Sequence, residues 1–217
     1  MSAITHEGEH AVTSPCTYWD GLSGESLKAV LAVPANQCIE KELADCCKAE
    51  EFGYWTTSRL SLTLTTRTAY RLPVVRVFVG ALAGRMSLNE ELQERIHTAV
   101  QEALMNAVLH GNLKIVASRR HDLAGLLALH ESIDSLLADD EVARRVVDIR
   151  AVWSGTRLHV VVRDSGDGFE LSELPSSVAR DVDDAIASGR GLRILGAMCD
   201  RFTLLRGGQA VKMSFEL

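Results

Sequence analysis

The sequence has no long apolar run and no segment typical of a targeting signal. None of its hydrophobic stretches approaches the roughly 20 residues that a membrane-spanning helix needs. The N-terminus also lacks a basic segment followed by an apolar one, so we expect no secretory signal. These absences predict a cytoplasmic protein without a membrane partner.

Cysteine patterns typical of zinc sites or disulfide frameworks are missing as well. The five cysteines are an odd number, and no two of them have CxxC spacing. We therefore expect neither kind of site, and a reducing compartment fits best. The adjacent pair Cys46 and Cys47 is interpreted as two half-buried apolar residues on a helix rather than as a redox pair.

Positive charge is scarce. Lys and Arg number 23 against 29 Asp and Glu, which gives a net charge of -6 at pH 7. Nonspecific binding to nucleic acid depends on clustered positive charge, and no basic patch is evident along the chain. We therefore expect no nucleic-acid partner.

What is present is an ordinary globular composition, with 47% hydrophobic and 24% charged residues in 217. This length suits one domain with an appendage or two small domains. Residues 1–57 form the predicted extension, with a polar tail to about residue 22 and helical patterns at 23–33 and 36–52. Pro34 separates the two patterns, Asn36 is the expected N-cap of the second, and Gly53 its expected stop. We find no chemical motif in this extension.

Residues 58–217 show a mixed pattern of strands and helices. Alternation predicts a half-buried strand over 59–66, Pro73 opens a helix to about residue 85, and Ser87 with Glu90 forms a capping box. A further helical segment is expected over 113–140, and another helix between 164 and 202. The remaining predicted strands are 145–153, 157–163, 202–206 and 209–217. Because the late strands come as hairpins, we expect an α/β fold with a mixed or antiparallel sheet and helices on one side.

The central stretch, residues 94–112, has the apolar period of a helix. On another face, polar side chains recur every four residues, so they stack along the helix: Thr98, Glu102, Asn106 and His110. A carboxamide can ligate a hard cation such as Mg²⁺, and a carboxylate one turn away can orient or deprotonate a nucleophile. The alternative is an ordinary solvated helix face.

A first glycine loop, residues 164–169, follows the apolar strand directly. Asp164 can accept a hydrogen bond from an exocyclic amine such as that of adenine, and Gly166 and Gly168 let the backbone approach a ligand closely. The alternative is a plain β-turn.

A second loop, Gly189-Arg190-Gly191-Leu192, leads into an amphipathic helix. Free amides at a helix start form an anion site, and Arg190 can add a charge-assisted contact. The loop is neither a Walker nor a Rossmann motif, because GxxxxGK[ST] and GxGxxG are both absent.

The ordered set of a Glu-x3-Asn helix, a DxGxGF loop and a GxGL helix start resembles the N, G1 and G2 boxes of GHKL ATPases. Glu102-Ala103 with Asn106, followed by His110-Gly111, is most similar to the anti-sigma-factor serine/threonine protein kinases. The resemblance covers about residues 58–217. It implies the Bergerat α/β two-layer sandwich, a mixed and largely antiparallel sheet with helices on one face.

The resemblance also implies roles in binding ATP and Mg²⁺. Glu102 would be the general base, Asn106 the Mg²⁺ ligand and Asp164 the adenine acceptor. The remaining nucleotide contacts would come from His110, Gly166, Gly168, Gly189, Arg190, Gly191 and Leu192.

The implied function is phosphorylation of an anti-anti-sigma (STAS-type) protein, or sequestration of a sigma factor, by a homodimer. The alternatives are a binding module with little or no kinase activity, and a histidine-kinase-like domain acting on a separate phosphoacceptor.

Two features depart from that pattern. Asp167 adds a second carboxylate to the first loop, which is unfavourable near phosphates unless it points to solvent. The lid, residues 170–188, carries Glu173, Asp181, Asp183 and Asp184 against Arg180 alone and offers little positive charge to a γ-phosphate. We therefore expect a modest affinity for nucleotide.

Overall fold

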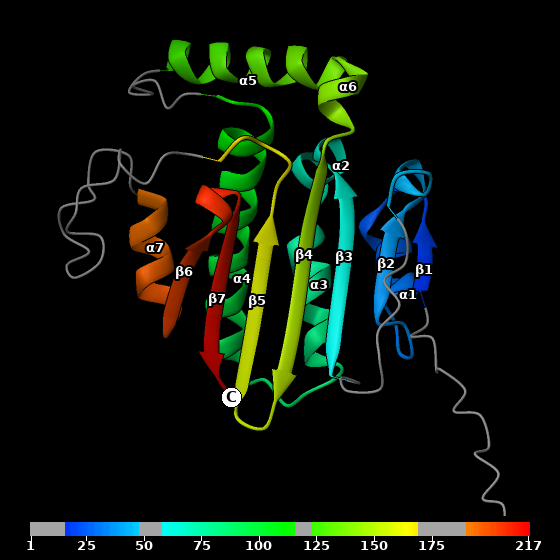
Figure 1. Cartoon of the computed structure of the whole chain (residues 1–217), viewed down its shortest axis with the longest axis vertical. Coiled ribbons are helices and arrows are strands. Elements are labelled where there is room, and N and C mark those ends of the chain that lie inside the picture. The colour runs from blue at the N-terminus through cyan, green and yellow to red at the C-terminus, as the bar shows by residue number, and fades with distance from the viewer. Residues whose placement is uncertain (1–15, 48–57, 116–122, 169–189) are drawn as a thin grey trace, which may run out of the picture.

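The described chain forms one seven-stranded mixed sheet (Figure 1). The computed structural model describes residues 16–47, 58–115, 123–168 and 190–217. The strand order is β1-β2-β3-β4-β5-β7-β6, with β1–β2 and β2–β3 parallel and the other pairs antiparallel. The strands are β1 Cys16–Trp19, β2 Gln37–Glu40, β3 Arg59–Thr65, β4 Val146–Ser154, β5 Arg157–Arg163, β6 Arg201–Leu205 and β7 Ala210–Glu216. The predicted α/β fold with a largely antiparallel sheet is confirmed.

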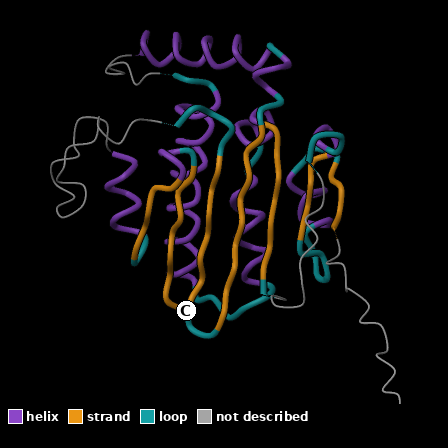
Figure 2. The backbone as a smooth tube through the Cα atoms, in the orientation of Figure 1, coloured by secondary structure: helices purple, strands orange, loops and turns teal. Residues whose placement is uncertain are grey.

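Helices cover one face of this sheet. In Figures 1 and 2 the helices α1, α3 and α4 lie behind the strands, and α5 crosses above the upper end of the sheet. The helices are α1 Gly24–Val30, α2 Thr66–Arg71, α3 Val74–Ala83, α4 Glu90–Asn106, α5 Leu123–Ala138, α6 Asp140–Ala143 and α7 Arg190–Met198. Within the described ranges, none of these helices combines the length and the apolarity needed to span a bilayer.

The core lies between the sheet and these helices. Alternate residues of neighbouring strands meet there in register, as Leu62 does with Ile149 and Ile149 with Val162. All three are 0–2% exposed, and each buried aliphatic side chain of this size contributes about 1.5–3 kcal/mol. The helices add their own apolar stripes to the same cluster. Among the described residues, no helix covers the opposite face of the sheet (Figure 1).

The N-terminal part differs from its prediction. The helix expected over 36–52 is wrong within the described residues up to 47, because Gln37–Glu40 is strand β2 and a short 3₁₀ turn follows at Lys41–Leu43. Residues 48–52 lie outside the described residues. β1 lies within the predicted polar tail, where Trp19 is only 1% exposed. Pairing with β3 makes residues 37–40 a strand instead of a helix, since Cys38 lies beside Leu62 in the register. The predicted helix over 23–33 is confirmed as α1, which Ser23 caps.

β3 is buried on both faces, rather than half-buried as its alternation predicted. The Thr65 hydroxyl and amide and the Thr68 hydroxyl donate to the Glu40 carboxylate at 2.7–3.2 Å. Glu40 is 3% exposed, so these bonds replace the water that its carboxylate has lost. Residues 16–47 thus share the sheet and core with later elements. The domain boundary after residue 57 stays a prediction.

The positions of the helices α3 and α4 agree closely with the sequence-based prediction. The helix predicted from Pro73 is confirmed as α3. The capping box at Ser87 is wrong, because Asn89 is the N-cap of α4 and its side chain accepts from the Leu92 amide at 2.8 Å. α4 then runs without a break through the central stretch and ends in a π-helical turn, Ala107–Asn112. Residues 116–122 of the helical segment predicted over 113–140 lie outside the described residues.

Candidate nucleotide site

α4 holds Glu102 and Asn106 half-buried beside the first turn of α7. Its predicted apolar stripe is confirmed, because the side chains of the following residues are buried: Ile96, Val100, Ala103, Leu104, Ala107 and Val108. A Cβ built on Gly191 would collide with Oε1 of Glu102 and lie 2.9 Å from Nδ2 of Asn106. The start of α7 therefore packs directly on the two polar side chains, and a glycine at 191 leaves them in this position.

Gly191→Ala is expected to move Glu102 and Asn106 while leaving the fold intact, because the crowded atoms are the ends of flexible side chains. The thermal midpoint without nucleotide should change little, whereas its rise with Mg²⁺·ATP should shrink by at least half. Gly80→Ala in α3 is the matched control, since nothing lies within 4 Å of the added Cβ. The control should gain up to about 1 kcal/mol of stability and keep the full nucleotide response. Equal responses in the two variants would contradict the packing.

The π-helical turn moves His110 off the polar stripe. The Leu113 amide donates to the Val108 carbonyl, five residues back, at 2.9 Å. In such a wide turn four residues no longer complete a revolution, so the spacing that stacks Glu102 on Asn106 does not continue. His110 is exposed, and its Nδ1 lies 2.8 Å from the Ile115 carbonyl oxygen. Its contact with nucleotide stays a prediction.

The same turn brings Gly111 against the first glycine loop. A Cβ on Gly111 would lie 2.6 and 2.7 Å from the carboxylate oxygens of Asp164, and one on Gly166 would collide with the Gly111 carbonyl. Burial raises the pKa of Asp164, partly offset by the Gly166 amide, which donates to its Oδ1 at 2.8 Å. Asp164 thus offers a half-buried acceptor at the end of α4.

Asn112 is a positioning residue that the sequence motifs did not single out. It is 0% exposed, and its Nδ2 donates to Oγ1 of Thr66 at 2.8 Å and to the Val146 carbonyl at 3.2 Å. Its Oδ1 accepts from the Ser165 amide at 2.9 Å, next to Asp164. One buried side chain therefore joins α2, β4 and the loop. Its only signal in the sequence is its place directly after His110-Gly111.

The far side of the loop is tied to the turn before β7. The Asp164 amide donates to the Gln209 carbonyl at 3.0 Å, and Nε2 of Gln209 donates to the Gly166 carbonyl at 2.7 Å. Gly168 has a φ of +76°, and a Cβ there would collide with the Gly207 carbonyl. The loop is thus held from both sides, as a preformed site requires.

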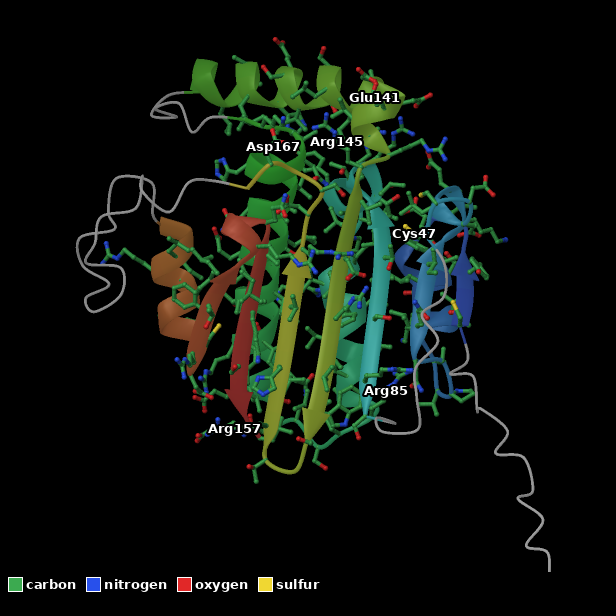
Figure 3. All side chains as sticks on the ribbon, in the orientation of Figure 1. Cys47, Arg85, Glu141, Arg145, Arg157 and Asp167 are labelled. Carbon is green, nitrogen blue, oxygen red and sulfur yellow. The ribbon has the colours of Figure 1, made fainter. Side chains whose placement is uncertain are left out.

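Asp167 points away from the site. Its side chain is 82% exposed at the upper end of the sheet (Figure 3). The hydrogen bond and the charge of Lys114 hold the pKa of Asp167 below its usual value. The second carboxylate of the loop is therefore solvated and paired, which removes the conflict with phosphate that its position in the sequence suggested.

The residues present fit a nucleotide with Mg²⁺. Asn106 and Glu102 supply the oxygen donors that a hard cation prefers. Within the described ranges no group of three or more His, Cys, Asp and Glu could hold a metal, so Asn106 would share the ion with phosphates and waters. Leu192 is partly buried against the core. Arg190 opens α7. Gly189 and the predicted lid lie outside the described residues.

These elements define an α/β domain in which one helix contacts both glycine loops, an arrangement that suits a nucleotide. A family model of the histidine kinase-like ATPase domain matches residues 64–215. The chain therefore belongs to the histidine kinase-like ATPase family of the GHKL superfamily. Domains of this kind bind ATP, usually with Mg²⁺. Among curated proteins, none matches the chain.

Proposed function

We propose that the chain is an ATP-dependent protein serine/threonine kinase of the anti-sigma-factor type. In this proposal it phosphorylates an anti-anti-sigma (STAS-type) protein, or sequesters a sigma factor, in partner-switching signalling. The observation that carries it is the position of α4, whose Glu102 and Asn106 lie against Gly191 while Gly111 lies against Asp164. The candidate base and metal ligand therefore lie on one helix. The candidate adenine acceptor and phosphate-binding turn pack against that same helix.

In the proposed reaction the hydroxyl oxygen of a seryl or threonyl residue of the partner attacks the γ-phosphorus of the substrate ATP. Glu102 accepts the proton of that hydroxyl. The bond to the β–γ bridging oxygen breaks, and ADP leaves. Asn106 would hold Mg²⁺, which supplies charge neutralisation for the phosphates, and Asp164 would fix the adenine amine. Phosphoryl transfer depends mainly on such positioning and charge neutralisation, so this small set of groups is sufficient for the proposed reaction.

The binding step is tested with Asn106→Ala. A ligand at a hundred times its dissociation constant stabilises the native state by about 2.7 kcal/mol. For a chain of this size that corresponds to a rise in thermal midpoint of roughly 5–10 °C with Mg²⁺·ATP. We expect the wild type to show this rise, and Asn106→Ala to lose most of it. A well-folded wild type without any rise would favour a binding module that does not use nucleotide.

The transfer step is tested with γ-labelled ATP and a purified candidate partner. Acid-stable phosphoserine or phosphothreonine on the partner is the expected product. Acid-labile phosphohistidine would instead support a histidine-kinase-like domain acting on a separate phosphoacceptor. Nucleotide binding without transfer to any cognate partner would contradict the kinase proposal.

A further inference from the structure

The outward face of β5, β6 and β7 concentrates positive charge. Its outward positions carry Arg157, Arg163, Arg201 and Lys212, and Glu216 is the one carboxylate in these three strands. We call these four cationic side chains and the strand surface between them the basic face. The chain as a whole has a net charge of -6, so this face differs in sign from the rest of the molecule. No basic patch was evident from the linear sequence.

The basic face is open and hollowed. No described helix lies in front of β5 and β7 in Figure 1, and Arg157 projects at the lower end of β5 in Figure 3. A cavity of about 390 Å³ lies on this face, and its lining includes Arg157, His159, Arg201, Lys212 and Ser214. A shallow cavity lined largely by cationic and hydroxyl side chains suits acidic groups.

Arg201 and Lys212 keep their charge available. Neither forms an ion pair with another residue of the described segments. The two carboxylates that also line the cavity are already engaged. Asp200 pairs with Arg95 at 2.7 Å, and Glu216 lies 3.7 Å from Arg157. The cavity therefore has a surplus of positive charge.

His159 also lines this cavity, and its Nδ1 lies 2.9 Å from Oγ of Ser214. Burial lowers the pKa of His159, and the charges of Lys212 and Arg157 lower it further. A nearby carboxylate would act in the opposite direction. The local field therefore opposes an added proton and favours an anionic group.

Apolar side chains indicate which kind of anion fits. Leu205 and Val152 are 38% and 42% exposed at the two ends of this surface, and Val161 lies partly buried between Arg150 and Lys212 in the register. No Phe, Tyr or Trp occupies an outward position on β5, β6 or β7, so a platform for stacking bases is missing. Two copies of the face would repel each other by like charge.

We propose that the basic face docks an acidic protein segment with interspersed apolar side chains. The face lies on the side of the sheet opposite α4, so docking leaves Glu102 and Asn106 accessible (Figure 1). The proposal does not depend on ATP use. A partner can therefore be held on one side of the sheet while the nucleotide site works on the other.

The probes are two fluorescein-labelled nonapeptides of equal charge, with three Glu-Glu-Leu or three Glu-Glu-Ser repeats. Their binding to the full chain is followed by fluorescence anisotropy in 50 mM NaCl. We expect the Leu peptide to bind at least threefold more tightly. Arg201→Glu with Lys212→Glu should weaken its binding at least tenfold, and raising NaCl to about 200 mM should weaken it severalfold.

Lys28→Glu with Arg76→Glu is the matched control, since both side chains are exposed on helices and the change in net charge is the same. The control should lose less than threefold. Arg201→Ala with Lys212→Ala is a milder second double variant. For both double variants, far-ultraviolet circular dichroism and the response to Mg²⁺·ATP check that the protein is folded. The proposal would be overturned if both double variants at Arg201 and Lys212 bound the Leu peptide as tightly as the wild type does. It would also be overturned if the control variant lost as much affinity as these double variants. Tighter binding of an oligothymidylate than of either peptide would overturn the assignment to a protein.

Discussion

Glu102→Gln is expected to slow phosphoryl transfer to the partner by about 10²–10⁴-fold, the usual contribution of a general base. The amide has nearly the shape of the carboxylate, so the contact with Gly191 is kept, but it cannot take the hydroxyl proton. Because Asn106 and Asp164 are unchanged, Mg²⁺·ATP should still raise the thermal midpoint. The measurement is initial-rate transfer of label from γ-labelled ATP, with the midpoint recorded for the same preparation.

Glu94→Gln is the matched control for that experiment. Glu94 lies two turns earlier on the same stripe of α4 and is exposed, so removing its charge changes the net charge equally. Its transfer rate should stay within about twofold of the wild type. If Glu102→Gln transfers phosphate as fast as Glu94→Gln, the carboxylate is not the base. If it also loses the nucleotide response, Glu102 acts in binding instead.

Asn112→Ala is expected to give the largest loss of stability, about 2–4 kcal/mol. The substitution removes the acceptor of the Ser165 amide and the donor to the buried Thr66 hydroxyl, and it leaves a hole where the Asn112 side chain is 0% exposed; losses of this kind are costly. The thermal midpoint should fall by roughly 4–16 °C. The response to Mg²⁺·ATP should also shrink, because the loop that carries Asp164 loses one of its anchors.

Asn89→Ala separates these two effects. Asn89 caps α4, and the loss of an N-cap costs about 1 kcal/mol. Because Asn89 does not touch the Asp164 loop, the control should lose some stability and keep its full nucleotide response. An Asn112→Ala protein that melts like the wild type would show that the hydrogen bonds of Asn112 contribute little. One that melts early but responds fully to nucleotide would limit its role to stability.

The sequence alone was sufficient for most of the main sheet and for the choice of candidate site residues, whose chemistry stays a prediction. The strands at β4, β5 and β7 and the helices α3 and α4 have clear periods of two or 3.6 residues, which local packing then satisfies. The polar residues of the three boxes could be chosen because their types suit nucleotide chemistry and because their order resembles the N, G1 and G2 boxes of GHKL ATPases. The structure brings Glu102, Asn106 and Gly191 together and places Asp164 at the end of the same helix.

Long-range contacts decided the rest. Residues 37–40 have no alternation, and only pairing with β1 and β3 makes them a strand. The wide turn at Ala107–Asn112 departs from the α-helical period, so helix geometry extrapolated from Glu102 misplaces His110. Asn112 binds groups from residues 66, 146 and 165, which no local pattern connects.

The basic face likewise combines features that the sequence pattern predicts with an arrangement that only the tertiary structure produces. Arg157, Arg163 and Lys212 stand in predicted strands, whereas Arg201 directly precedes the strand predicted at 202–206. In the observed strands, alternation places all four side chains on the side opposite the apolar core. Their convergence depends on the order β5-β7-β6, which brings Arg157, Lys212 and Arg201 from three separate segments onto one surface. The sequence by itself determined the strands β3 to β7, the central helix and the types of polar group at the candidate nucleotide site. The tertiary structure decided which groups meet, because electrostatic and hydrogen-bonding contacts depend on distance in space rather than along the chain.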